Sequence, residues 1–169
     1  MDPAGSPARR AEAKLKPTMQ PTTQTSTELP ATDLVTRRLI PFRRTRVLSA
    51  FLDPARLERW WGPAGFTNEF EVCEPVPGGL WRFTMIGPDG TRYANECRFV
   101  SVGPESIVIR HVTAEPFVLI LQLAEAQGGT ELTWRQSFET AEVRRRVEAV
   151  VVPSNEENID RLLQELERG

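Results

Sequence analysis

Alternating apolar and polar positions predict β-structure through the middle of the chain. Trp81, Phe83 and Met85 alternate with Leu80, Arg82 and Thr84, which is the period of two expected of a half-buried strand. The same kind of pattern predicts strands over residues 34–42, 67–74, 79–86, 92–102, 106–113, 116–125 and 129–138. The connections contain Pro-Gly-Gly, Pro-Asp-Gly, Gly-Pro and Gly-Gly, which are turn sequences. Connections this short favour antiparallel pairing.

Two short helices are predicted between the first and second strands. Residues 43–52 place four apolar side chains on one helical stripe. Asp53-Pro54 then starts a second helix, because Asp is a good N-cap and Pro fits the first helical position. Leu57, Trp60 and Trp61 are expected to share one face of that helix, which the Gly-Pro pair at 62–63 ends.

The C-terminal segment predicts a helix that proline interrupts. Apolar residues recur at helical spacing from residue 139 onward, on both sides of Pro153. Directly after the proline, Ser154 and Glu157 have the spacing of a capping box. A proline forced into a straight helix costs about 3 kcal/mol. We therefore expect the helix to be kinked or broken at Pro153, with a new start at Ser154.

The first 33 residues differ in composition from the rest of the chain. They contain no aromatic residue, five prolines and a Thr/Gln/Pro-rich stretch, and their charges cancel. Such a segment buries too little apolar surface to offset the entropy of ordering it. We predict a disordered N-terminal tail over residues 1–33 and one folded domain over residues 34–169.

Composition narrows the classes of function. A chain of 169 residues suits one domain, and a net charge of −2 gives no sign of a nucleic-acid partner. No apolar run approaches the ~20 residues of a membrane span, and no signal peptide is visible, so a cytoplasmic location is expected. Cys73 and Cys97 fall two predicted strands apart, about 9–10 Å, which exceeds the reach of a disulfide. Their spacing suggests no metal site, and we expect neither a metal nor a cofactor.

The order of elements is an α+β pattern: a strand, two short helices, six antiparallel strands and a long helix. A curved sheet around one amphipathic helix leaves space between them, and a gap lined by rings is a typical ligand cavity. The candidate lining residues are Trp60, Trp61, Phe66, Trp81, Phe83, Met85, Tyr93, His111, Phe117, Trp134 and Ile159.

Each candidate also has a purely structural interpretation. Trp60 and Trp61 either stack on a ligand at the pocket mouth or close the core, and two adjacent helical positions cannot both point inward. His111, the only histidine, is either a general base or an ordinary packed residue. The polar strand residues either fix the polar end of a ligand or cover the solvated face; they are Glu71, Tyr93, Asn95, Glu96, Arg98, Gln122 and Arg135.

Five motifs at these places carry a family resemblance. They are Asp53-Pro54 with Trp60-Trp61-Gly62-Pro63, Gly78-Gly79-x-Trp81-Arg82-Phe83, Gly87-Pro88-Asp89-Gly90, Gly128-Gly129-Thr130-x-Leu132-Thr133 and Asn158-Ile159-Asp160-Arg161-Leu162. Together they resemble the SRPBCC or START-like superfamily, and within it the single-domain bacterial homologues of the heat-shock-protein ATPase activator, a polyketide-cyclase-like branch. The resemblance implies a helix-grip fold, in which a curved seven-stranded sheet grips the C-terminal helix around an elongated apolar pocket.

The resemblance implies no particular chemistry, and three functions follow from it and from the residues. The first is non-catalytic binding of a small apolar or amphipathic molecule between the sheet and the C-terminal helix. The second is a cyclase or dehydratase acting on aromatic or polyketide-type substrates, with positioned polar side chains such as His111 or Glu96 converging inside the cavity. The third is a co-chaperone-like or regulatory protein that contacts a chaperone. Either a monomer or a homodimer is compatible with each.

Overall fold

One antiparallel sheet of seven strands organises residues 28–169, the part of the chain that the computed structural model describes. The strand order is β1-β7-β6-β5-β4-β3-β2. The strands are β1 (Asp33–Ile40), β2 (Thr67–Cys73), β3 (Leu80–Ile86), β4 (Arg92–Val102), β5 (Ser106–His111), β6 (Phe117–Ala126) and β7 (Gly129–Phe138). All seven predicted strands are therefore present, joined in sequence from β2 to β7, with β1 closing on β7.

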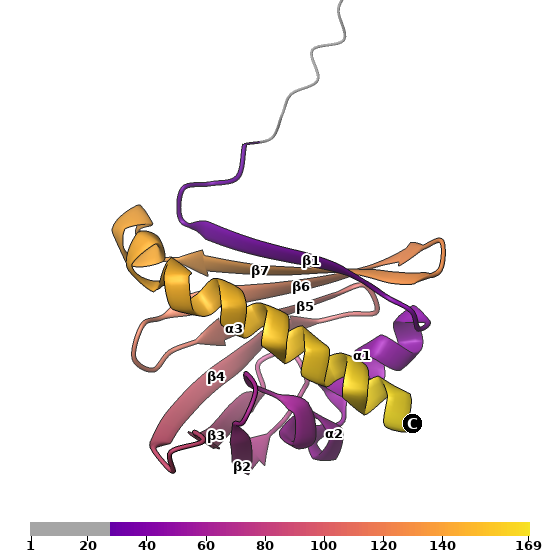
Figure 1. Cartoon of the computed structure of the whole chain (residues 1–169), viewed down its shortest axis with the longest axis horizontal. Helices are drawn as coiled ribbons and strands as arrows, with labels where there is room; N and C mark the ends of the chain where they lie inside the picture. The colour runs from indigo at the N-terminus through magenta and orange to yellow at the C-terminus, as the bar shows by residue number, and fades with distance from the viewer. Residues whose placement is uncertain (1–27) are drawn as a thin grey trace, which may run out of the picture.

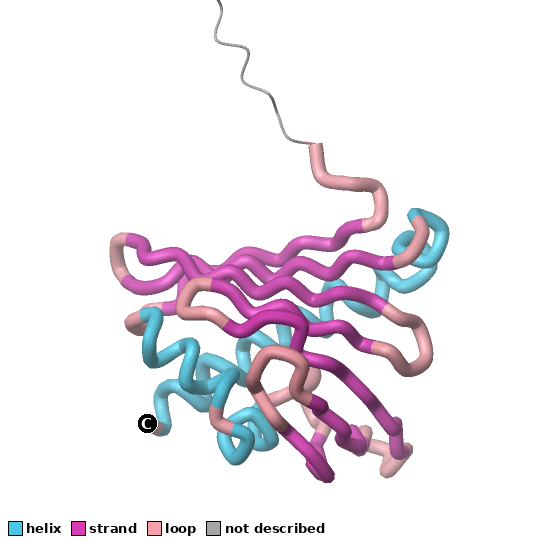
Figure 2. The backbone as a smooth tube through the Cα atoms, turned by 180° about the vertical axis from the view of Figure 1, so that it is seen from behind, coloured by secondary structure: helices cyan, strands magenta, loops and turns pink. Residues whose placement is uncertain are grey.

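Three helices lie on one face of this sheet, which curves around them (Figures 1 and 2). They are α1 (Arg44–Leu52), α2 (Pro54–Trp60) and α3 (Ala141–Arg168). Helix α3 crosses the concave face diagonally, and its C-terminal half packs against α1 and α2 (Figure 1). This arrangement confirms the predicted α+β helix-grip fold.

The fold begins at the predicted tail boundary. Strand β1 starts at Asp33, one residue before the expected start of the domain. The Asp33 carboxylate is buried against Arg135, and the carbonyl of Thr32 accepts a hydrogen bond from the backbone N–H of Phe138 at 3.0 Å. Pairing with β7 thus includes these two residues in the domain. Residues 1–27 of the predicted tail lie outside the described residues.

Helix α2 starts where its cap predicts and ends earlier than expected. The Asp53 side chain accepts from the backbone N–H groups of Ala55 and Arg56, at 3.0 and 3.4 Å. The helix ends at Trp60, and Trp61 already has extended backbone angles of φ −61° and ψ 137°. The expectation that Trp60 and Trp61 share a helical face is therefore wrong. Because the chain turns between them, both indoles reach the interior.

The prediction that the last helix breaks at Pro153 is also wrong. Helix α3 continues from Ala141 to Arg168 through the proline. Ser154 does not cap a new helix, because its hydroxyl donates to the carbonyl of Val150 at 2.7 Å. Pro153 lacks the N–H that would bond to the carbonyl of Ala149, and because Ala149 is exposed, water can reach that carbonyl. Burial of Asn155 and Ile159 one turn further on holds the helix to the sheet.

Aromatic rings fill most of the space between the sheet and the helices. Trp60, Trp81 and Trp134 are each no more than 2% exposed. Cys73 and Cys97 both pair with Trp81, from the strands on either side of it. The two thiols are free, as the predicted separation of two strands requires.

Candidate functional site

A partly enclosed hollow of about 210 Å³ lies beside this aromatic centre, and we call it the inner hollow. Its walls come from four neighbouring strands, β3 to β6, together with the residue that follows α2. Its lining residues are Trp61, Trp81, Phe83, Met85, Asn95, Cys97, Ile109, His111, Phe117 and Leu119.

The cross-strand register explains why space remains here. Trp81 pairs with Cys97, Cys97 with His111, and His111 with Phe117, so these four side chains form one row across the concave face. The imidazole of His111 stacks on Phe117 with ring centroids 4.7 Å apart and planes 8° apart. Cys97 is the smallest member of the row and stands between two large ring systems. The inner hollow follows from that difference in size.

Trp61 covers the hollow on the helix side. Its indole stacks on Trp134 with centroids 5.4 Å apart and packs edge-on against Trp81 at 4.9 Å. Gly62 follows with a φ of +99°, and a Cβ at this position would lie 2.7 Å from the terminal carbon of Met85. A residue other than glycine would thus strain the backbone and press on a wall of the hollow.

Helix α3 holds the segment that carries Trp61. One guanidinium nitrogen of Arg161 donates to the carbonyls of Trp61, Gly62 and Pro63 at 3.0–3.1 Å, and the other donates to the carbonyl of Arg59 at 3.0 Å. The amide oxygen of Asn158 accepts from the backbone N–H of Gly62 at 3.1 Å. These bonds satisfy carbonyl groups that the end of α2 leaves free. They also fix the position of the Trp61 indole over the hollow.

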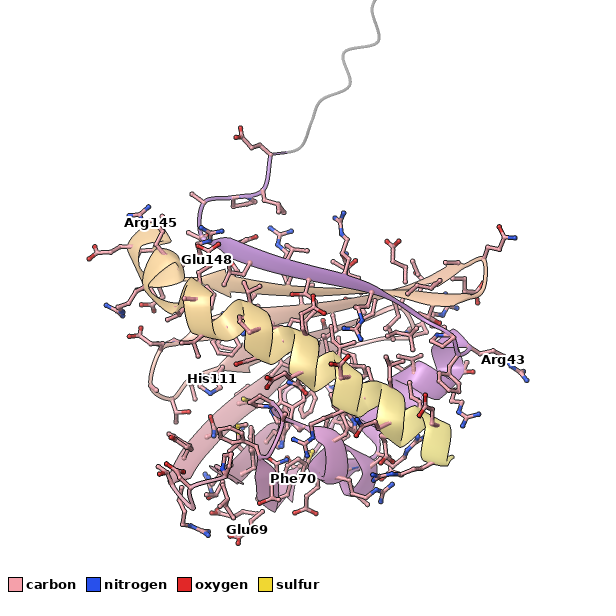
Figure 3. The ribbon with its side chains drawn as sticks, in the orientation of Figure 1. Arg43, Glu69, Phe70, His111, Arg145 and Glu148 are labelled. Carbon is pink, nitrogen blue, oxygen red and sulfur yellow. The ribbon has the colours of Figure 1, made fainter. Side chains whose placement is uncertain are left out.

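His111 is the only ionisable group of the lining apart from a thiol. It lies at the end of β5, on the side of the sheet that α3 covers (Figure 3). Burial lowers the pKa of His111, and a backbone contact with Glu115 offsets part of that lowering. Nδ1 of His111 has no hydrogen bond of normal geometry. Burial raises the pKa of Cys97 to about 12, so this thiol is protonated at neutral pH.

A second, shallower depression of about 340 Å³ lies at the ends of β5, β6 and β7. It shares His111 and Phe117 with the inner hollow. Its other lining residues are Arg110, Val112, Pro116, Val118, Ser137, Phe138 and Glu139. The His111–Phe117 stack therefore stands between the solvent-facing depression and the interior.

The structure divides the predicted lining residues into three groups. Trp61, Trp81, Phe83, Met85, His111 and Phe117 surround the inner hollow. Trp60, Trp134 and Ile159 belong to the packed core instead. Phe66 and Tyr93 pair with each other, with centroids 6.1 Å apart, at the end of β4, where Tyr93 is 48% exposed.

Glu96 does not join His111. It pairs across the sheet with Arg82 and forms an ion pair with it at 3.3 Å. Its chain neighbour Cys97 lines the hollow, and successive side chains of a strand point to opposite faces. His111 and Glu96 therefore lie on opposite faces of the sheet, so of these two candidates only His111 lines the hollow.

Four lining residues were not among the candidates: Asn95, Cys97, Ile109 and Leu119. Asn95 was one of several polar strand positions left open between the two faces. The others carry no chemical signal of their own. The turn at residues 87–90 fixes the register of β3 and β4. Because Ile86 pairs with Arg92 across this turn, Trp81 lies opposite Cys97. Counting the register from that turn would have found Cys97.

Residues 28–169 lack two other kinds of feature. No group of three or more His, Cys, Asp or Glu side chains is placed there to hold a metal ion. Within the same range, no helix has the length and apolar character that crossing a membrane requires.

The seven-stranded sheet and the long C-terminal helix define a helix-grip protein of the SRPBCC or START-like superfamily. The chain matches the family described as "Activator of Hsp90 ATPase homolog 1-like protein" over residues 41–168, and it belongs to that family.

Solved structures agree with this assignment. A protein from Rhodobacter sphaeroides is similar with 28% identity and a TM-score of 0.74, over 82% of this chain and 94% of that one. Protein NE0264 from Nitrosomonas europaea has the same fold with 19% identity and a TM-score of 0.76, over 84% and 99% of the two chains. An AHSA1-like protein from Aeromonas hydrophila matches with 18% identity and a TM-score of 0.65, over 80% and 92%. Comparison with curated proteins gave no match.

Proposed function

We propose that this protein binds a small apolar or amphipathic molecule in the inner hollow. The observation that carries the proposal is the partly enclosed space of about 210 Å³ that adjoins an otherwise filled aromatic core. Protein interiors are normally packed as densely as organic crystals. A hollow walled by tryptophan, phenylalanine and methionine therefore suits an apolar guest.

The volume limits the size of the guest. Pockets for drug-sized ligands measure about 300–1,000 Å³, whereas an apolar cavity of about 150 Å³ accepts benzene. At about 210 Å³, the inner hollow suits one ring with small substituents. A long acyl chain or a fused polycycle would have to displace Trp61, which the bonds from Arg161 oppose.

Thermal unfolding and calorimetric titration against a panel of single-ring compounds, fused polycycles and fatty acids test the proposal. A ligand present at a hundred times its dissociation constant stabilises the folded state by about 2.7 kcal/mol. Single-ring compounds are expected to raise the melting temperature, and fused polycycles are not.

Two cysteine variants provide a matched pair for this test. Cys97→Leu enlarges a lining residue and should abolish binding. Cys73 is the other cross-strand neighbour of Trp81 and does not line the hollow, so Cys73→Leu should leave the affinity unchanged. No binding across the panel, or equal loss in both variants, would contradict the proposal.

A further inference from the structure

Two side chains of the inner hollow carry polar atoms that have no hydrogen-bond partner. They are Nδ1 of His111 and the indole nitrogen of Trp81, both buried. Buried polar groups are nearly always paired, and leaving one unpaired costs about 1–3 kcal/mol. Trp60 shows the usual arrangement, because its indole N–H donates to the carbonyl of Ala50 at 3.0 Å. The indole nitrogen of Trp134, in the packed core, is unpaired as well, so what distinguishes the two atoms at the hollow is the open space that their residues line.

The hydrogen bonds around His111 assign its free nitrogen as an acceptor. The side-chain amide of Asn95 donates to the carbonyl of Tyr93 at 2.8 Å, which turns its oxygen towards Nε2 of His111 at 2.9 Å. With the Asn95 amide in this orientation Nε2 carries the proton, and the hydroxyl of Thr113 lies 3.4 Å from the same nitrogen. Burial disfavours the imidazolium form more than the backbone of Glu115 favours it, so Nδ1 presents a lone pair.

Trp81 offers the complementary group. An indole N–H can only donate, so its partner must be an acceptor. The register places Trp81 and His111 two strands apart, about 9–10 Å between Cα atoms, with Cys97 between them. A single ring with polar groups at opposite ends suits the distance.

The lining also selects against charge. Asn95, Cys97 and His111 are its only polar side chains besides the indoles, and none provides a cation for an anionic guest. An unpaired carboxylate in such a place carries a large desolvation penalty.

From these contacts we infer that the inner hollow selects a neutral single-ring molecule with a hydroxyl group at one end and a carbonyl group at the other. The hydroxyl donates to Nδ1 of His111, and the carbonyl accepts from the indole N–H of Trp81. The inference rests on the proposed binding function and adds the chemical class of the ligand.

Four compounds of similar size separate the contributions. 4-Hydroxyacetophenone has both groups, acetophenone lacks the donor, 4-ethylphenol lacks the carbonyl, and 4-hydroxybenzoate is anionic. Titration of the full chain at pH 7 should show 4-hydroxyacetophenone binding about threefold to tenfold more tightly than either neutral analogue, one hydrogen bond being lost in each. 4-Hydroxybenzoate should not bind detectably.

Variants and spectra assign each contact. His111→Phe keeps a ring against Phe117 and should reduce the affinity for 4-hydroxyacetophenone to that for acetophenone, with acetophenone changed less than twofold. In ¹⁵N-labelled protein, the Trp81 indole N–H resonance should shift downfield with both ketones and not with 4-ethylphenol. The Trp60 resonance should stay in place, because its hydrogen bond to Ala50 is internal.

The outcomes separate this inference from the proposed function. Equal affinity for 4-hydroxyacetophenone and its two neutral analogues would overturn the inference and leave small-molecule binding intact. Preferred binding of 4-hydroxybenzoate would overturn it as well. If no compound binds, here or in the wider panel, both fail.

Discussion

Replacing Pro153 by alanine should stabilise the protein, because α3 runs unbroken through this position. Proline is about 3 kcal/mol less favourable than alanine inside a helix. Proline also restricts the unfolded chain, which offsets about 0.4–1 kcal/mol of that difference. Pro153 is exposed, so the substitution removes no core contact. The expected net gain is about 2 kcal/mol, or roughly 4–8 °C in melting temperature for a domain of this size.

Ser154→Ala distinguishes the continuous helix from the capping box that the sequence suggests. If Ser154 began a new helix, losing its side chain would cost about 1 kcal/mol. In the structure its hydroxyl bonds back to the carbonyl of Val150, which does not cap a helix. Alanine should therefore be neutral or stabilising by up to about 0.5 kcal/mol.

Urea unfolding followed by circular dichroism at 222 nm gives both free energies. Val152→Ala, a change at a neighbouring exposed position, should stay within about 0.5 kcal/mol of the parent protein. A continuous α3 is refuted if Pro153→Ala leaves the free energy of unfolding unchanged while Ser154→Ala lowers it by about 1 kcal/mol.

Three further predictions concern charged and polar groups. Burial lowers the pKa of His111 in the folded state, so the unfolded chain takes up a proton first as the pH falls. Stability should therefore fall as the pH drops from about 6.5 through the lowered pKa. His111→Phe should flatten this part of the curve of unfolding free energy against pH, measured in urea. Glu165→Gln removes a carboxylate that is 2% exposed and ion-paired with Arg56 and Arg59, and should cost about 2–4 kcal/mol in urea unfolding. Arg161→Lys cannot reproduce the four carbonyl contacts and should cost about 1–3 kcal/mol by the same measurement.

The Glu165 and Arg161 predictions have control variants in the same helix, and the His111 prediction has an outcome that would contradict it. Glu167→Gln and Arg168→Lys change exposed residues of α3 and should stay within about 0.5 kcal/mol of the parent. Losses in these controls equal to those in Glu165→Gln and Arg161→Lys would contradict the assigned contacts. If the pH dependence of stability is the same in His111→Phe, another titratable group causes it.

Much of the fold could be predicted from local patterns in the sequence. The alternation of Trp81, Phe83 and Met85 located β3, and it also placed all three at the inner hollow. Asp53 and Pro54 predicted the start of α2, because a cap depends on residues only a few positions away. Periodicity and capping are properties of short segments, so the sequence expresses them directly.

Tertiary contacts decided the remaining features. Pro153 stays in a helix because burial on the sheet one turn further on outweighs its local cost. Trp61 covers the hollow because Arg161, a hundred residues away, holds the turn that follows α2. Cys97 leaves room because the register sets it between Trp81 and His111. The sequence alone thus determined which segments are strands and helices and that the rings of β3 face inward. Only packing between distant segments decided which rings fill the core and which border an open space, because neither cross-strand register nor helix docking is visible in a local pattern.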